Sequence, residues 1–155
     1  MHKILFVCHG NICRSPMAEF IFKDLVKKAG LEENFVIASA ATSTEEIYRG
    51  VGNPVYPPAQ DELKKHGLSA KGKRARQINQ SDYDFYDLLI CMDENNLRNM
   101  HFMLGGDPMH KFFKLLDFTD SKGDVADPWY TDRFDKTYED IYRGCVALLE
   151  YLSKK

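Results

Sequence analysis

Four short apolar stretches recur along the chain, each bounded by polar or turn-forming residues. They cover residues 4–7, 35–38, 88–91 and 112–115. Stretches of this length that are rich in Val, Ile, Leu and Phe are typical of strands buried on both faces of a sheet. The first stretch ends abruptly at residues 8–11, which include a glycine, so we expect a loop directly after this strand.

Helical patterns separate the apolar stretches. Ser15 and Pro16 combine a capping hydroxyl with Pro at the first helical position, which predicts a helix that runs to about Gly30. The other helices are expected to begin at Pro57, after a cap at Asp93, and after a cap at Thr131 or Asp135. Strands that alternate with helices predict a three-layer α/β fold in which helices cover a four-stranded parallel sheet. Ligands of such sheets bind beyond the carboxyl ends of the strands, where the loop after the first strand should lie.

Length and composition favour a single domain over residues 1–155, because 155 residues with 44% hydrophobic content can form one core. The net charge of −2 gives no electrostatic footprint for nucleic acid. No apolar run approaches the roughly 20 residues that cross a bilayer, and no signal peptide is evident, so we expect a cytoplasmic protein without membrane insertion. Four cysteines in such a protein should be reduced thiols rather than a disulfide framework.

The loop after the first strand carries the most specific chemistry. It places the Cys8 thiol and the Arg14 guanidinium six positions apart, around a turn that leads into a helix. Backbone N–H groups of such a loop and the positive end of the helix can bind a phosphate, and Arg14 can hold two of its oxygens. The same field favours the thiolate form of Cys8, which is the nucleophilic form. The predicted phosphate-binding loop comprises His9, Gly10, Asn11, Ile12, Cys13, Arg14 and Ser15.

Residues 8–16, with the sequence Cys-His-Gly-Asn-Ile-Cys-Arg-Ser-Pro, resemble the loop of the low-molecular-weight protein-tyrosine phosphatases at every defining position. The resemblance extends over most of the chain and implies a flavodoxin-like fold with the sheet order 2-1-3-4. It also implies a network of side chains that supports the loop, in which Glu19 pairs with a histidine. The matching positions here are Asn11, Ser15, Glu19, Ser39 and His66.

A general acid should protonate the leaving oxygen when Cys8 attacks phosphorus. Asp127 precedes Pro128 and an aromatic pair in a stretch without helical periodicity, and this segment resembles the acid loop of the family. The nearby Asp124 lacks that context and is expected to be a solvated loop charge. The expected catalytic residues are therefore Cys8, Arg14 and Asp127, and the reaction should require neither a metal nor another cofactor.

Aromatic walls would favour phosphotyrosine over the shorter phosphoserine. The resemblance implies that Trp129 and Tyr130 form one wall. The opposite wall is formed either by Tyr48 or by a more acidic segment, residues 45–46, which would favour basic phosphopeptides. Members of the family that act on phosphoarginine tend to carry Thr where this chain has Ile12, so Ile12 favours phosphotyrosine.

Three alternative functions share the loop: a thiol-coupled arsenate reductase, a phosphoarginine phosphatase and an inactive phosphate-binding module. Cys91 matches the first of two further cysteines that the reductase requires, but residues 95–98 contain none in place of the second. An inactive module would need neither a nucleophile nor an acid. The expected partner is a phosphotyrosine protein substrate, with a tyrosine kinase as a further candidate, and the expected assembly is a monomer or a weak dimer.

Overall fold

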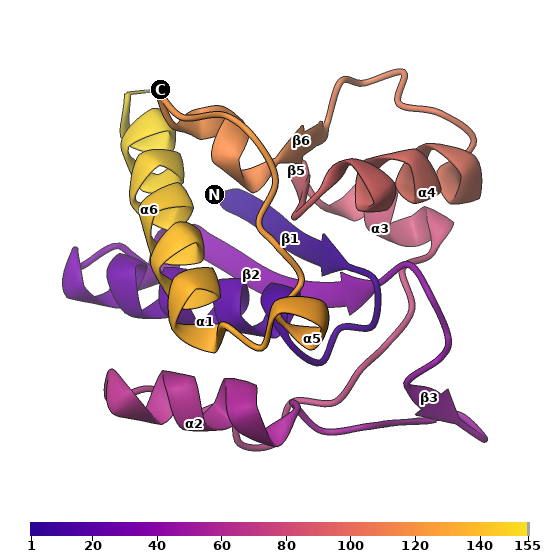
Figure 1. The fold of residues 1–155 in the computed structure, drawn as a ribbon. Helices are drawn as coiled ribbons and strands as arrows, with labels where there is room; N and C mark the ends of the chain where they lie inside the picture. The colour runs from indigo at the N-terminus through magenta and orange to yellow at the C-terminus, as the bar shows by residue number, and fades with distance from the viewer. Residues whose placement is uncertain (155) are drawn as a thin grey trace.

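The computed structural model, which describes residues 1–154, contains one parallel sheet of four strands (Figure 1). Strand β1 (His2–Cys8) lies at its centre, between β2 (Phe35–Ala41) and β5 (Leu88–Cys91), and β6 (Phe112–Lys114) forms an edge. The order β2-β1-β5-β6 and the parallel pairing confirm the predicted single-domain α/β class and the predicted order 2-1-3-4 of the main strands.

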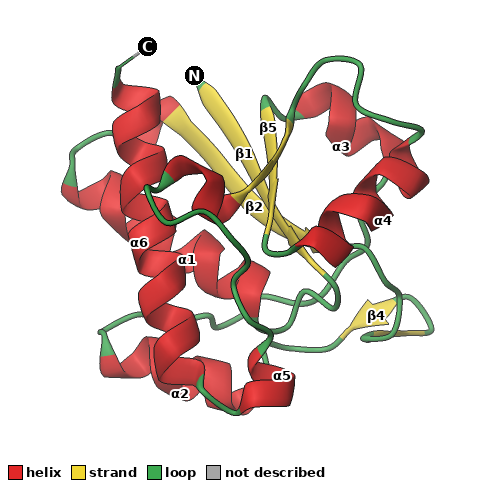
Figure 2. Ribbon diagram, turned by 45° about the horizontal axis from the view of Figure 1, so that its top comes forward, coloured by secondary structure: helices red, strands yellow, loops and turns green. Residues whose placement is uncertain are grey.

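Helices cover both faces of the sheet, as Figures 1 and 2 show. Helices α1 (Arg14–Lys28) and α6 (Phe134–Ser153) lie on one face, and α3 (Gln80–Phe85) and α4 (Glu94–Leu104) lie on the other. The alternation of side chains along β1 explains why both faces are apolar: one face of the strand contributes to the core beneath α1 and α6, and the other to the core beneath α3 and α4. Among residues 1–154, no helix is both long and apolar enough to cross a membrane.

The helix starts differ from those predicted. Helix α1 begins at Arg14 and has no side-chain cap, because the Ser15 hydroxyl that was expected to cap it contacts Cys8 instead. Helix α6 begins at Phe134 without a side-chain cap, so neither Thr131 nor Asp135 serves in that role. The predicted α2 (Pro57–Lys65) and the Asp93 cap of α4 are confirmed.

Several short elements were not predicted, because each is too short to show a periodic pattern. They are the hairpin of β3 (Ile47–Tyr48) and β4 (Val51–Gly52), helix α3, the four-residue helix α5 (Pro128–Thr131), and the 3-10 helices η1 (Glu32–Asn34) and η2 (Leu115–Phe118). The hairpin and α5 matter for function because the segments that lead into them reach the loop after β1.

Candidate active site

The loop after β1 lies at the carboxyl edge of the sheet, between the strands that flank β1 on either side. Because the strand order reverses at β1, its carboxyl end is the place where a parallel α/β sheet forms a ligand crevice. Residues 9–13 connect β1 directly to α1, whose first turn contains no acidic side chain. The positive end of the helix therefore faces the loop without a built-in carboxylate to neutralise it.

The Cys8 sulfur lies inside this loop and receives three polar contacts. The Ser15 hydroxyl lies 3.0 Å from Sγ, and the backbone N–H groups of Asn11 and Ser15 donate to Sγ at 3.3 and 3.4 Å. Asn11 has φ of +59°, the left-handed conformation that Asn tolerates better than most residues and that turns the loop around the sulfur. Donors arranged in this way stabilise a thiolate.

A buried chain of hydrogen bonds fixes the direction of the Ser15 hydroxyl. The Asn11 side-chain nitrogen donates to Ser15 Oγ at 2.8 Å and to Ser39 Oγ at 2.9 Å, while Asn11 Oδ1 accepts from the backbone N–H of Arg76 at 3.2 Å. Ser39 in turn donates to Glu19 at 2.6 Å. Because Ser15 Oγ already accepts from Asn11, its own hydrogen remains to be donated to Cys8.

Glu19 does not pair with His66, so that part of the predicted network is wrong. His66 ends α2, contacts Glu62 one helical turn earlier at 3.2 Å, and stacks on Tyr138 with ring centroids 3.7 Å apart. The cations near Glu19 are Lys23 at 2.6 Å and Lys73 at 3.8 Å. A neighbouring carboxylate on the same helix therefore holds His66 away from the loop.

Lys73 was missed by the sequence analysis. Its Nζ donates to the Ser39 carbonyl oxygen at 2.9 Å, and its side chain is mostly buried. Burial lowers the pKa of Lys73, and the Glu19 carboxylate only partly offsets that effect. Nothing in the local sequence distinguishes Lys73 from Lys71 nearby, so only the fold could bring it into the network.

Replacing Ser15 with Ala is expected to lower kcat/KM for aryl phosphates by roughly 10- to 100-fold, because a hydrogen bond to the thiolate is lost. Ser39→Ala, one hydrogen bond further from the sulfur, is the matched control and should have a smaller effect. Equal losses in Ser15→Ala and Ser39→Ala would exclude this role for the hydroxyl.

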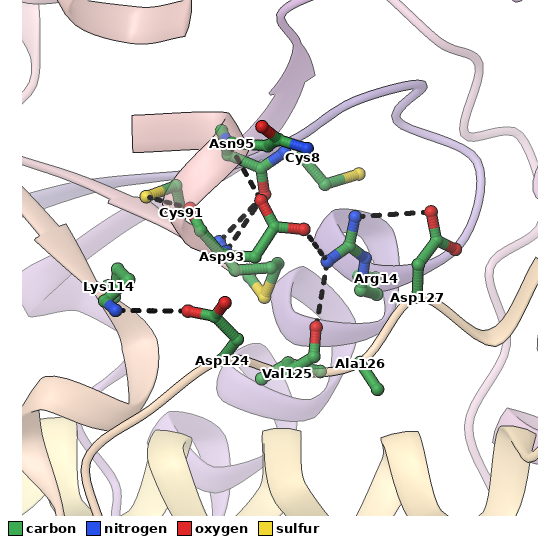
Figure 3. A network of polar contacts seen from close by, with 12 residues as sticks. Cys8, Arg14, Cys91, Asp93, Asn95, Lys114, Asp124, Val125, Ala126 and Asp127 are labelled. Carbon is green, nitrogen blue, oxygen red and sulfur yellow. Dashed lines mark hydrogen bonds and ion pairs between the residues drawn. The ribbon is translucent and has the colours of Figure 1, made fainter. Parts of the chain in front are cut away.

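Arg14 is 3% exposed and is held from behind by two groups. Its Nη1 donates to Asp93 Oδ2 at 2.6 Å and to the Val125 carbonyl at 2.9 Å, while Nη2 lies 3.5 Å from Asp127 Oδ2 (Figure 3). Within residues 1–154, Nε has no hydrogen-bond partner. Burial by itself lowers the pKa of Arg14, but the negative charges of Cys8 and Asp93 outweigh it and raise the pKa overall. The guanidinium thus stays charged, with Nε and Nη2 placed to grip an anion.

Asp93 was predicted only as a helix cap, but it has a second role. Its Oδ1 accepts the backbone N–H of Asn96 at 2.8 Å and so caps α4, as predicted, but its Oδ2 anchors Arg14. The sequence did indicate that Asp93 lies near the site, because Asp93 follows a buried strand and parallel neighbouring strands end at the same edge of the sheet.

Asp127 is the N-cap of the short helix α5. Its Oδ1 accepts the backbone N–H of Trp129 at 3.0 Å, and its backbone is extended, as expected for a residue before proline. The segment before it is tied to the sheet by the backbone hydrogen bond from Val125 to Met92. Asp124 is exposed in its loop, as predicted for a solvated charge, and its carboxylate pairs with Lys114 at 3.1 Å (Figure 3).

These groups line a cavity of about 380 Å³. The loop contributes Cys8, His9, Gly10, Ile12, Cys13 and Arg14. Asp127, Trp129 and Tyr130 line it from the α5 side, and Trp129 is supported from behind by Tyr56, with ring centroids 5.1 Å apart. Nucleophile, guanidinium, carboxylate and aromatic wall therefore surround one space. Among residues 1–154, no group of three or more His, Cys, Asp or Glu is arranged to hold a metal ion.

The remaining lining of the cavity comes from Glu45 and Glu46, in the segment that leads into β3. Tyr48, the alternative candidate for this wall, does not line the cavity: its side chain is 72% exposed and lies beside Arg49. Of the two possibilities left open by the sequence, the structure thus places the acidic segment at the cavity.

Comparisons with known proteins agree with this arrangement. A family model described as low molecular weight phosphotyrosine protein phosphatase matches residues 3–155. The chain is 40% identical to the low molecular weight protein-tyrosine-phosphatase YfkJ of Bacillus subtilis, over 100% of this chain and 98% of the relative. It is 40% identical to the rat low molecular weight phosphotyrosine protein phosphatase, over 95% and 93% of the two chains. The crystal structure of YfkJ superposes with a TM-score of 0.93 at 39% identity, covering 99% of this chain and 96% of that one. The chain belongs to the low molecular weight phosphotyrosine protein phosphatase family.

Proposed function

We propose that this protein hydrolyses phosphotyrosine and aryl phosphates through a cysteinyl-phosphate intermediate, with Cys8 as the nucleophile. One observation carries the proposal. The Cys8 sulfur, held by three donors, lines the same cavity as the Arg14 guanidinium and the Asp127 carboxylate. Within this proposal the protein is a cytoplasmic enzyme that acts on the products of a tyrosine kinase, as a monomer or a weak dimer.

In the first step, the Cys8 thiolate attacks phosphorus and forms the S–P bond while the bond between phosphorus and the ester oxygen breaks. The electron pair of that bond leaves with the aryl oxygen, which takes a proton from the Asp127 carboxyl group. In the second step, the Asp127 carboxylate removes a proton from water, the water oxygen attacks phosphorus, and the S–P bond breaks. Inorganic phosphate and the Cys8 thiolate result.

Arg14 stabilises the transferring group in both steps. With Nη1 held by Asp93 and Val125, the guanidinium can present Nε and Nη2 to two phosphoryl oxygens, and the backbone N–H groups of the loop add further donors. Such preorganised donors provide the largest share of catalysis in reactions that transfer charge to oxygen. When phosphate occupies the fork, the 3.5 Å contact between Nη2 and Asp127 would be replaced, which frees Asp127 for the leaving oxygen.

The cavity suits an aromatic phosphate ester. Ile12 and the Trp129 indole line it, and both offer apolar contact to a phenyl ring. Cys91, the residue that matched an arsenate reductase, is fully buried, and burial raises the pKa of its thiol. Helix α4, which follows it, contains no cysteine. A thiol relay from Cys8 through Cys91 therefore lacks both a reactive second thiol and a third one.

The deciding experiment measures hydrolysis of p-nitrophenyl phosphate and of matched peptides carrying phosphotyrosine, phosphoserine or phosphoarginine, in buffer with a chelator. We expect turnover of p-nitrophenyl phosphate and of the phosphotyrosine peptide. Preference for the phosphoarginine peptide would assign the chain to that alternative. Absence of any turnover, with phosphate still bound, would reduce the protein to a phosphate-binding module.

Replacing Trp129 with Ala is expected to raise KM for phosphotyrosine peptides by about five- to tenfold, because the aromatic contact is lost, with a smaller change for p-nitrophenyl phosphate. Phe102→Ala is the matched control, since Phe102 is an exposed aromatic on α4 that does not line the cavity. Equal changes for peptide and small substrate would show that the wall lies elsewhere.

A further inference from the structure

Hydrogen bonds and packing hold the acidic wall of the cavity in place. Glu46 is partly buried; its Oε1 accepts from the Asn53 side chain at 3.0 Å and its carbonyl accepts from the Asn53 backbone at 2.8 Å. Its Cγ lies so close to Gly10 that a side chain there would approach it to 3.2 Å. The β3–β4 hairpin thus holds the Glu46 stem against the phosphate-binding loop itself.

Glu45 extends the wall outward. Its carboxylate lies 3.0 Å from Nε2 of His9, a loop residue, and its side chain is 68% exposed. The segment carrying Glu45 and Glu46 and the helix α5 carrying Trp129 lie apart in Figures 1 and 2, so the acidic and aromatic walls are separate parts of the cavity rim.

These charges oppose a small phosphate. Arg14 and the loop amides serve the phosphoryl group, which leaves Glu45 and Glu46 facing the remainder of the substrate, with the exposed His9 in contact with Glu45. A phosphate dianion with no compensating charge is repelled by both carboxylates. A Lys or Arg near the phosphotyrosine reverses the sign of the interaction, and can also displace His9 from Glu45.

We propose that Glu46, assisted by Glu45, selects phosphotyrosine sites with Lys or Arg within about two residues, the reach that an extended peptide spans at 3.3–3.6 Å per residue. The inference rests on the proposed function and names its substrate class. Glu46 should contribute more than Glu45, because it is fixed by Asn53 and less exposed, whereas a solvated charge is weakened by screening.

The test uses three phosphotyrosine peptides that differ only in having Lys, Gln or Glu on both sides of the phosphotyrosine, at low and at high salt. We expect kcat/KM to fall in the order Lys, Gln, Glu, with roughly a tenfold span at low salt that shrinks at high salt. Glu46→Gln should lower kcat/KM for the Lys peptide and raise it for the Glu peptide, so that their ratio falls about threefold or more.

Glu33→Gln is the matched control, because it makes the same change in net charge at an exposed residue of η1 that does not line the cavity. Its ratio should equal that of the unaltered protein. If peptides are hydrolysed but the ratio is one, or responds equally to Glu46→Gln and Glu33→Gln, the selectivity is wrong while the phosphatase proposal stands. If neither the peptides nor p-nitrophenyl phosphate are hydrolysed, the phosphatase proposal itself fails.

Discussion

Replacing Cys8 with Ser is expected to lower kcat for aryl phosphates by about 10⁴-fold or more while inorganic phosphate still binds. The hydroxyl is a far weaker nucleophile, because it stays protonated where the thiol forms a thiolate. The groups proposed to hold phosphate, namely Arg14 with its anchors Asp93 and Val125, are unchanged by the substitution. Loss of the thiolate also removes a negative charge beside the phosphate, so binding should be equal or tighter.

Trp129 provides the readout for binding, because it is the only tryptophan of the chain and lines the cavity. Titration of its fluorescence with inorganic phosphate should give a similar or lower Kd in Cys8→Ser. Cys145→Ala, which alters a buried thiol of α6 outside the cavity, is the control and should retain activity. Hydrolysis by Cys8→Ser at a rate near that of the control would assign the nucleophile to another group.

The local half of the site could be predicted because its members are close in sequence. Cys8, Asn11, Arg14 and Ser15 lie within eight positions, so the chemistry of one strand, one turn and one helix start fixes their relation. The left-handed Asn11 and the contact of Ser15 with Cys8 both follow from that short segment. The extended backbone at Asp127 was likewise set by its neighbour, Pro128.

The distant half could not be predicted, because it depends on which of several similar side chains the fold brings near. Glu19 forms an ion pair with Lys73, which lies 54 positions away, whereas His66 contacts Glu62 within its own helix. Sequence spacing favours neither outcome. A local helical contact competes with a distant one for the same side chain, and only the packing of α2 against α6 settles it, through the stacking of His66 on Tyr138.

The residues of the acidic wall could not be predicted from the sequence either. Glu45 and Glu46 lie in the turn before β3, whereas Tyr48 lies in β3 itself, so the choice between them depends on how this turn and the hairpin fold. In the hairpin, Ile47 pairs with Gly52 and Tyr48 with Val51. Two-residue strands carry too little pattern to specify this fold from the sequence, and the resemblance to the family left two candidates for the wall, Tyr48 and residues 45–46.

Replacing Asp127 with Asn is expected to lower kcat most for substrates with poor leaving groups. A general acid contributes roughly 10²- to 10⁴-fold, and it matters least when the departing oxygen is already stable as an anion. We therefore expect a loss of about 10²-fold or more for phenyl phosphate and phosphotyrosine, whose leaving groups resemble a tyrosine phenol of pKa about 10, and a clearly smaller loss for p-nitrophenyl phosphate.

The geometry makes Asp127→Asn a clean substitution, because Asn can still accept the backbone N–H of Trp129 and cap α5 as Asp127 Oδ1 does. The aromatic wall should stay in place, so a change in rate reports the proton and the charge rather than a collapsed loop.

Asp124→Asn is the matched control: it weakens the pair with Lys114 in the same segment and should affect both classes of substrate equally and weakly. The measurement is the dependence of log kcat on the leaving-group pKa, which should be steeper in Asp127→Asn than in the control. Parallel lines for the two variants would mean that Asp127 positions α5 and Arg14 but donates no proton.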